Sequence, residues 1–474
     1  MSCHGAPPMT NPAGDNPDRD EIPSLQWEER SLLRRTILSR HAWVTYILAS
    51  FAAIFAGFGA FYFHLAEGWS MTFFDFIQGR SELWGMRVPG WLGLLLPGVA
   101  AIGGMMLIMR IRDKFFPGTE GTGIPQAIAA LQTPEGPLRS KMLSWRICFG
   151  KMILLTMGLF AGTTIGREGP SVHVGAAAMY MITKITRFPD YLVRRGLILA
   201  GGGAGIAAAF NTPVAGAIFA IEEIGRSFEK ENAATIVRTV FIACIVGILF
   251  FGNYLFYGRV DVGLESPVQW LAIPIIGIAG GFLGGCFARA VVRGTPIVSR
   301  NVRKHPWLTA GLLGLSLWIC GLLSSGQSYG SGYPQAQDML INGTQMPWHY
   351  PFLKAAASYA SLISGIPGGL FDPSLSVGAA LGQLVHPVIG PIFDGIPVEA
   401  VIMMFMVAYF CGVVQSPITC FVILVEMTAS YHMALPLMAT SIIAYNISHL
   451  ICRPSIYEAL ADIFLETKGI RNTS

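Results

Sequence analysis

An acidic and a basic residue lie next to each other within the apolar part of the chain. Residues 166–170 read Gly-Arg-Glu-Gly-Pro, between apolar runs at 152–165 and 172–185. Ionisable side chains at membrane depth are costly unless they face protein or water, which makes Arg167 and Glu168 candidate functional residues. Glycine permits a close approach of backbone, and proline suits the first turn of a helix. The segment therefore predicts a helix that begins near Glu168.

The chemistry available to Glu168 follows from this position. The first N–H groups of a helix have no partner inside it and attract negative charge. A carboxylate there competes with a bound anion for the same donors, and it loses its charge when it takes up a proton. The alternative is structural, an ion pair between Arg167 and Glu168 that caps a buried helix.

Composition indicates an all-α polytopic membrane protein. Of 474 residues, 53% are hydrophobic and 13% are charged, and the mean hydropathy is +0.53. The net charge of +4 is too small to indicate nucleic acid binding. The eight cysteines form no CxxC pair, so we expect no metal site and no cofactor. No HExxH motif or paired catalytic acids stand out, so an intramembrane enzyme is not expected.

Apolar runs recur along the chain after a polar N-terminal segment. Several are broken by Gly and Pro, which is tolerated at membrane depth only where protein or an aqueous cavity covers the break. We therefore expect tilted, unequal and half-spanning helices. The runs lie near residues 42–66, 88–109, 144–165, 171–185, 193–224, 234–256, 267–290, 305–323, 350–364, 374–390, 398–428 and 433–452.

An internal repeat organises these runs. GTGIPQA at 121–127 recurs as GSGYPQA at 330–336, an offset of 330 − 121 = 209. PSVHVGAA at 170–177 recurs as PSLSVGAA at 373–380, an offset of 373 − 170 = 203. Asn-Thr-Pro, ending at Pro213, recurs as Gln-Ser-Pro, ending at Pro417, an offset of 417 − 213 = 204. Similar offsets in one order indicate two related halves.

The two halves are predicted to have opposite orientations. Basic residues precede the first run, whereas in the second half they follow the first run, at Arg289 to Lys304. By the positive-inside rule the second half begins outside, which gives the inverted repeat of secondary transporters. The predicted parts are a cytoplasmic tail and surface helix (1–40), the first repeat (41–256), the second repeat (257–453) and a cytoplasmic helix carrying Tyr457 (454–474).

Three Gly-rich turns, at 121–125, 166–170 and 365–373, each lead into an apolar helix. If these helix starts converge, they form a cage of backbone N–H groups and positive dipole ends. Such a cage favours an anion. A cation site would need converging carbonyl groups and several carboxylates, which these motifs do not supply.

The motifs Gly-Thr-Gly-Ile-Pro, Gly-Arg-Glu-Gly-Pro and Gly-Gly-Leu-Phe-Asp-Pro, in this order and in an inverted repeat, resemble those of the CLC family of chloride channels and chloride/proton antiporters. The resemblance covers roughly residues 30–465. It implies a helical homodimer with one anion pathway per subunit, and chloride and protons as the transported ions.

The resemblance also implies residue roles. Glu168 matches the gating glutamate that competes with anion and carries the external proton, and Glu223 matches the internal proton glutamate of the antiporters. The chloride-binding residues are Thr122, where the family usually has Ser, Tyr457, and the amides of Leu370 and Phe371. The motif glycines are Gly121, Gly123, Gly166, Gly169, Gly368 and Gly369, and Lys151 and Arg167 bias the pathway electrostatically.

Simpler roles remain open for several of these residues. Thr122 could cap a helix, and Tyr457 or Lys151 could lie at the membrane interface. One of Glu222 and Glu223 could form a surface ion pair. We expect Glu426 to bond nearby backbone, His173 to pack in the core, and Asp372 to cap the helix that follows it.

The predicted function is exchange of chloride for protons across a prokaryotic plasma membrane, with both termini cytoplasmic. Channel members often replace the internal glutamate with an apolar residue, so Glu223 favours exchange. The alternatives are a passive voltage- or pH-gated chloride channel of the same family, or an exporter of another anion such as fluoride. About 17 residues follow Tyr457, too few for the paired cytoplasmic nucleotide-binding modules of many eukaryotic members.

Overall fold

The computed structural model describes residues 40–83, 85–185, 191–225, 230–252 and 254–469. The chain forms two compact units, Met1–Leu48 and Ala49–Ser474. Of the first unit, only residues 40–48 are described, and they are helical. The predicted tail and surface helix at 1–40 therefore lie almost wholly outside the described residues. The second unit contains nearly all of both predicted repeats.

Regular structure in the described part of the chain is helical, as the composition predicts, and two isolated β-bridges accompany it. The first-half helices are α2 (Arg40–Ile77), α3 (Gly90–Phe115), α4 (Ile124–Gln132), α5 (Pro137–Met142), α6 (Trp145–Phe160), α7 (Glu168–Ile185), α8 (Tyr191–Phe210), α9 (Pro213–Phe219), the π-helical η1 (Ala220–Gly225) and α10 (Lys230–Phe251). The second-half helices are α11 (Pro267–Trp270), α12 (Ala272–Lys304), α13 (Pro306–Leu323), α14 (Tyr333–Ile341), α15 (Tyr350–Ile363), α16 (Phe371–Ile389), α17 (Val398–Val414), α18 (Pro417–Thr428), the 3₁₀-helical η2 (Tyr431–Met433), α19 (Ala434–Ile451) and α20 (Ile456–Thr467).

Helix lengths are unequal, as expected for a protein with broken membrane helices. Among the described residues, 7 helical segments are long and apolar enough to cross a membrane. Shorter apolar helices include α17 and α18, of 17 and 12 residues. A helix of 12 residues rises about 18 Å, well short of a hydrocarbon core of about 30 Å. Such short helices end inside the protein, where other segments cover their ends.

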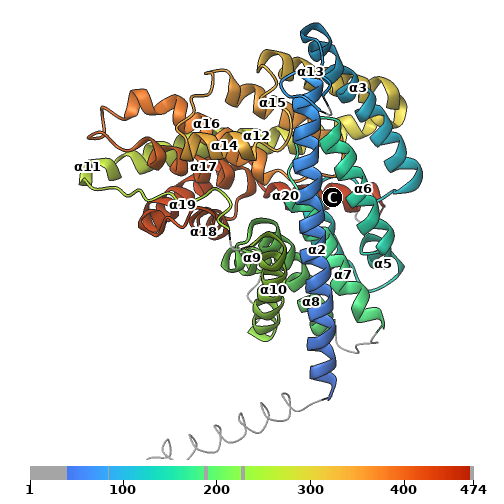
Figure 1. The fold of residues 1–474 in the computed structure, drawn as a ribbon. Coiled ribbons are helices and arrows are strands. Elements are labelled where there is room, and N and C mark those ends of the chain that lie inside the picture. Colours follow the sequence, from blue (N-terminus) through green and yellow to red (C-terminus); the bar gives the residue numbers. More distant parts are fainter. Residues whose placement is uncertain (1–39, 84, 186–190, 226–229, 253, 470–474) are drawn as a thin grey trace, which may run out of the picture. The chain divides into compact units, whose positions relative to one another are not determined.

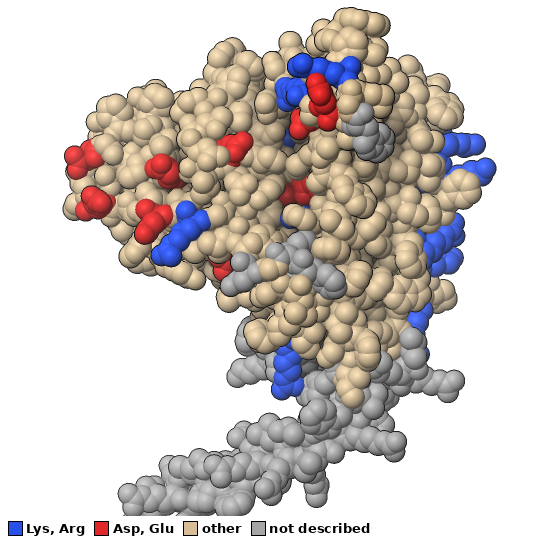
Figure 2. Space-filling model, in the orientation of Figure 1, with Lys and Arg blue, Asp and Glu red and all other residues tan. Residues whose placement is uncertain are grey.

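The surface of the second unit agrees with a lipid environment. Charged side chains are sparse on the face shown in Figure 2. Large apolar side chains are exposed, among them Trp91, Val99 and Leu249, which are 66%, 68% and 76% exposed. Exposure of so many large apolar side chains is unfavourable in water. The chain is a membrane protein.

The internal repeat is visible in the backbone as well as in the sequence. Gly121 and Gly330 have φ angles of 69° and 70°, and Gly162 and Gly365 have φ angles of 71° and 73°. These left-handed conformations strain any residue with a Cβ, which explains why glycine is found at both positions of each pair. The predicted repeat is therefore a repeat of structure.

The two halves also cap each other's helices. Glu222 accepts hydrogen bonds from the backbone N–H groups of Ile418 and Thr419 at 3.0 and 2.6 Å, in the first turn of α18. Glu426 accepts two N–H groups in the first turn of α9, at 3.1 and 2.7 Å. The two glutamates are repeat equivalents, because 426 − 222 = 204. The expectation that Glu426 bonds nearby backbone is confirmed, and Glu222 caps a helix in the same way.

Candidate functional site

The three Gly-rich turns meet inside the second unit. Gly166 and Gly369 exchange backbone hydrogen bonds of 2.8 and 2.6 Å, which form an isolated antiparallel bridge between the two repeats. The Gly121 N–H donates to the Gly365 carbonyl at 3.1 Å, and so joins the third turn to the other two. The helix starts therefore converge, as an anion site built from them requires.

Glycine is needed where these turns touch. A Cβ on Gly169 would lie 2.6 Å from the Thr122 carbonyl oxygen, and one on Gly123 would lie 2.8 Å from the Gly169 carbonyl oxygen. A Cβ on Gly368 would lie 2.4 Å from the Cβ of Ile165. Backbone cannot retreat from such contacts without moving the helices that follow. These glycines therefore allow the N-terminal ends of α4, α7 and α16 to lie close to one another.

Glu168 is the first residue of α7, as predicted, and is fully buried. Its carboxylate lies against the bridge between the repeats: a Cβ on Gly369 would lie 1.8 Å from Oε2, and one on Gly166 would lie 2.3 Å from each oxygen. Oε1 accepts the backbone N–H of Asp372 at 3.1 Å. Oε2 has no hydrogen-bond partner among the described residues. The carboxylate thus occupies a position among backbone donors where an anion would also be stabilised.

Arg167 does not pair with Glu168, so the structural alternative for this motif is wrong. Its guanidinium lies 3.4 Å from the Glu67 carboxylate and 2.6 Å from Nδ1 of His64, both on α2. It also lies over the Phe256 ring, 5.5 Å from the centroid. Glu168 is left without a direct cationic partner among the ion pairs of the described residues.

Thr122 and Tyr457 contribute two buried hydroxyl groups. In the described part of the chain, neither Thr122 Oγ1 nor Tyr457 Oη has a hydrogen-bond partner. Helix α4, which begins just after Thr122, packs against α20, which contains Tyr457. The Tyr457 ring lies 6.4 Å from the ring of Phe371. Buried hydroxyl groups nearly always have partners, so these two are available to a ligand.

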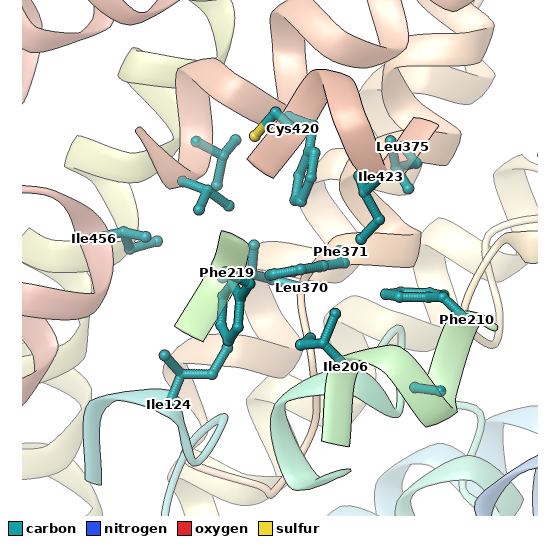
Figure 3. Close-up of a cluster of buried hydrophobic side chains, with 14 of the residues drawn as sticks. Ile124, Ile206, Phe210, Phe219, Leu370, Phe371, Leu375, Cys420, Ile423 and Ile456 are labelled. Carbon is teal, nitrogen blue, oxygen red and sulfur yellow. The ribbon is translucent and has the colours of Figure 1, made fainter. Parts of the chain in front are cut away.

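Two alternatives for these residues are wrong. Thr122 caps no helix, because the N-cap of α4 is Gly123, in a left-handed conformation with a φ of 109°. Tyr457 is fully buried and is not an interfacial anchor of the subunit. Tyr457 belongs to a buried hydrophobic cluster. Figure 3 shows other members of this cluster, Ile124, Phe219, Leu370 and Phe371, gathered from α4, α9 and the start of α16.

A cavity of about 290 Å³ reaches this region. Its lining includes Thr122, Gly121 and Leu370 from the converging turns, together with residues of α12 and α20. The charged groups in the lining are Arg112, Arg303, Lys468, Asp113 and Glu120. Three cations and two acids favour a small anion on electrostatic grounds. The sequence indicated the basic stretch that contains Arg303, but not the cavity that it lines.

Glu223 lies in the π-helical segment η1 and is buried. Its carboxylate accepts a hydrogen bond from the hydroxyl group of Ser416. Tyr457 interacts electrostatically with both Glu223 and Glu168. The repeat equivalent of Glu223 is Met427, since 223 + 204 = 427. The scaffold therefore does not require an acid here, in contrast to the capping glutamate beside it.

Lys151 is fully buried, which excludes the interfacial position considered for it. Its Nζ donates to the Gly121 carbonyl at 2.8 Å. Lys354 is its counterpart in the second repeat, since 354 − 151 = 203, and donates to the Gly330 carbonyl at 2.8 Å. Each lysine places a positive charge directly behind a Gly-rich turn. The sequence comparison of the two halves missed Lys354, although the shared offset could have identified it.

His173 and Asp372 complete the candidate residues. His173 is buried with Nε2 2.9 Å from the Met142 carbonyl oxygen, and its Cβ faces Gly123, so it packs as expected. The expectation that Asp372 caps α16 is wrong. The N-cap of α16 is Leu370, which makes no side-chain cap, and neither oxygen of Asp372 is hydrogen-bonded within the described residues. The N–H of Asp372 is already engaged by Glu168.

Unequal helices in an inverted repeat, with helix starts that meet at a buried carboxylate, define a membrane protein with the architecture of secondary transporters. The family model for the voltage-gated chloride channel matches residues 103–449. The chain therefore belongs to this family, the CLC family.

Individual relatives agree with this assignment. The protein named H(+)/Cl(-) exchange transporter ClcA from Vibrio parahaemolyticus is 28% identical over 439 residues, which cover 90% of this chain and 91% of the relative. The protein of the same name from Yersinia pestis is 31% identical over 390 residues, covering 78% and 77%. The crystal structure of a slow cyanobacterial Cl-/H+ antiporter superposes with a TM-score of 0.77 at 23% identity, covering 90% of this chain and 99% of that chain. This last similarity concerns the fold.

Proposed function

We propose that this protein is a secondary active transporter that exchanges chloride for protons across the membrane. The observation that carries the proposal is the carboxylate of Glu168, buried among the converging helix starts with one oxygen on a backbone N–H group. A group that binds where an anion would bind, and that a proton can neutralise, links the two ions in one place. The names of the bacterial relatives support the same function.

Chloride binds between the hydroxyl groups of Thr122 and Tyr457 and the amides of Leu370 and Phe371. The absence of partners for both hydroxyl groups in the described structure supports this site. Lys151 contributes a positive charge behind the Gly121 turn, and Arg167 contributes one on the outer side. Anions enter from the cytoplasm through the cavity lined by Thr122 and Leu370.

Glu168 is the gate and the external proton carrier. In its ionised form it accepts the Asp372 N–H and blocks the outer part of the anion path. Protonation removes the charge from this hydrogen bond and weakens it, because charge-assisted bonds are about twice as strong as neutral ones. The neutral side chain then leaves, and chloride takes its place.

Glu223 passes protons between the cytoplasm and the interior. Its burial, its hydrogen bond to Ser416 and its electrostatic interaction with Tyr457 support a role for this carboxyl group on the inner side of the chloride site. The chloride and proton routes share Glu168, and this sharing couples the two fluxes. The protein acts as a homodimer with one pathway per subunit, in a prokaryotic plasma membrane with both termini in the cytoplasm.

Proton movement against its own gradient tests the proposal. Purified protein is placed in liposomes, a chloride gradient is imposed, and the voltage is clamped to oppose passive proton flow. We expect protons to move uphill, visible as a change of external pH, and to stop when chloride is replaced by an impermeant anion. Fast chloride flux with no uphill protons would make the protein a channel and would overturn exchange. Fluoride flux that exceeds chloride flux would instead favour the fluoride exporter.

Gly369→Ala is expected to dislodge the Glu168 carboxylate. The new Cβ would lie 1.8 Å from Oε2, so the acidic side chain must move out of the space beside the bridge. We expect chloride flux to lose most of its dependence on pH, and overpacking to lower the free energy of unfolding by about 1–3 kcal/mol. Gly103→Ala on α3 is the control, because nothing lies within 4 Å of its Cβ. A pH profile of chloride flux equal to that of the unaltered protein would contradict this role of Gly369.

A further inference from the structure

Asp372 is a buried acid to which neither the scaffold nor the proposed function gives a role. It is the second residue of α16 and is fully buried. Both oxygens of its carboxyl group lack a hydrogen-bond partner in the described part of the chain. An ionised carboxylate without partners is one of the most costly groups to bury. The buried carboxyl group of Asp372 is therefore stable only if it holds a proton or binds a ligand.

The nearest acid is Glu168. The backbone N–H of Asp372 donates to Glu168 Oε1 at 3.1 Å, and the two carboxyl groups interact with each other. Glu168 Oε2 also has no partner among the described residues. Three carboxyl oxygens thus lie in one buried space with no side-chain donor directed at them. One proton held by this pair supplies the missing donor.

The charges around Asp372 also indicate that Glu168 and Asp372 together hold one proton. The groups that interact electrostatically with it are Glu168, Glu67, Arg167, Lys354 and the hydroxyl groups of Tyr254, Tyr257 and Tyr333.

Of the two cations in this set, Arg167 is 3.4 Å from Glu67. Lys354 donates to the carbonyl groups of residues 328, 329 and 330 at 3.1, 3.4 and 2.8 Å. Three acids face two cations, so the group is electrically balanced when Glu168 and Asp372 together hold one proton. Two adjacent carboxylates in a shared site bind a proton in this way, because like charges in contact cannot both ionise cheaply.

We propose that Asp372 is a second proton-carrying residue of the outer gate, which holds one proton in common with Glu168 and passes it directly to that residue. The inference rests on the proposed function, because it assumes that protonation of Glu168 opens the anion path. In the transfer, the O–H bond on Asp372 breaks and an O–H bond forms on Glu168, with no other reactant. Glu168 then leaves as a neutral side chain. Arg167 and Lys354 offset the charge that remains on Asp372 until it takes a new proton from outside.

Asp372→Asn tests the proposal, because the amide keeps the shape of the side chain and cannot carry the proton. A positioned proton donor typically accelerates a step by a factor of about 100 to 10,000. We expect chloride and proton fluxes to fall together by at least about tenfold near neutral pH, with an unchanged exchange ratio. In acid, bulk protons reach Glu168 directly, so the difference in flux between the variant and the unaltered protein should become smaller. Asp372→Glu should restore most of the flux at neutral pH.

The Glu168→Gln background separates a proton-carrying role from a merely structural one. With no titratable gate, Asp372→Asn should change chloride flux by less than about twofold, so that the two substitutions are not additive. Loss of chloride flux by the same factor in both backgrounds would make Asp372 structural and overturn the inference, as would an unchanged pH profile of the single variant. If the unaltered protein moves no protons uphill, the proposed function fails as well. If it does and Asp372→Asn behaves like it, only the role of Asp372 fails.

Discussion

Glu168→Gln is expected to carry chloride with no coupled proton movement. The amide is close in size to the carboxyl group, so the helix start and the bridge between Gly166 and Gly369 should remain. It carries no charge and cannot hold the exchanged proton. Proton flux should fall by at least about 100-fold, the usual contribution of a positioned acid or base. Chloride flux should persist and become independent of pH, because the gate no longer titrates.

The measurement compares chloride efflux and external pH in the same liposomes. Glu426→Gln is the matched control, because Glu426 is also an acid within the apolar part of the chain and bonds two backbone N–H groups. That variant should lose some stability and keep the exchange ratio. Uphill proton movement by Glu168→Gln would show that protons bypass this residue, and the assignment of the gate would fail.

Sequence patterns predicted the architecture because they are periodic over long stretches. The run at 350–364 corresponds to α15, Tyr350–Ile363, and the run at 433–452 to α19, Ala434–Ile451. The run at 193–224 is instead three segments, α8, α9 and η1. Hydropathy cannot detect such a break because the residues on both sides are apolar. The local signal was Asn211, which has a φ of 57° and recurs as Gln415 with a φ of 66°.

Short elements were harder to predict. Helix α5, with the sequence PLRSKM, is neither apolar nor long enough to show a helical period, and α14 follows a Gly-rich turn that was recognised only as part of the repeat. The π-helical form of η1 also has no sequence signature. It matters because it lies next to α9 and orients two successive glutamates, one toward α18 and one into the interior.

The interaction partners of Arg167 and Asp372 could not be predicted from the sequence. Arg167 and Glu168 are adjacent in the chain, but successive residues at a helix start point in different directions. The guanidinium therefore meets Glu67 on α2, a residue 100 positions earlier (167 − 67 = 100). Asp372 is at a position that suits a helix cap, but its N–H is bonded to the carboxylate of Glu168. The alternative pairing of Arg167 with Glu168 and the predicted cap at Asp372 both fail for one reason. Contacts between distant segments decide which groups pair, and local spacing does not reveal those contacts.

Glu223→Gln is expected to stop proton transport while chloride transport continues. Glu223 is buried, and its carboxyl group bonds to Ser416. It interacts electrostatically with Tyr457, which in turn interacts with Glu168. Glutamine can keep a hydrogen bond to Ser416 but cannot take up and release a proton. We expect proton flux to fall by at least about 100-fold. Chloride flux should stay within about threefold, because Glu223 is not among the proposed chloride ligands.

Glu222→Gln is the sharpest control, because the neighbouring residue has the same side chain and a different task. Glu222 bonds the first turn of α18 at 3.0 and 2.6 Å, as its repeat equivalent Glu426 bonds α9. Its replacement should lower the free energy of unfolding by about 1 kcal/mol, the usual cost of a weakened helix cap, and leave the exchange ratio unchanged.

Full proton coupling in Glu223→Gln would remove that residue from the proton path. Equal loss of coupling in both variants would mean that the π-helical segment acts through its shape. Loss of coupling in Glu223→Gln alone would separate the proton carrier from the cap, in keeping with the repeat equivalents, which are Met427 for Glu223 and Glu426 for Glu222.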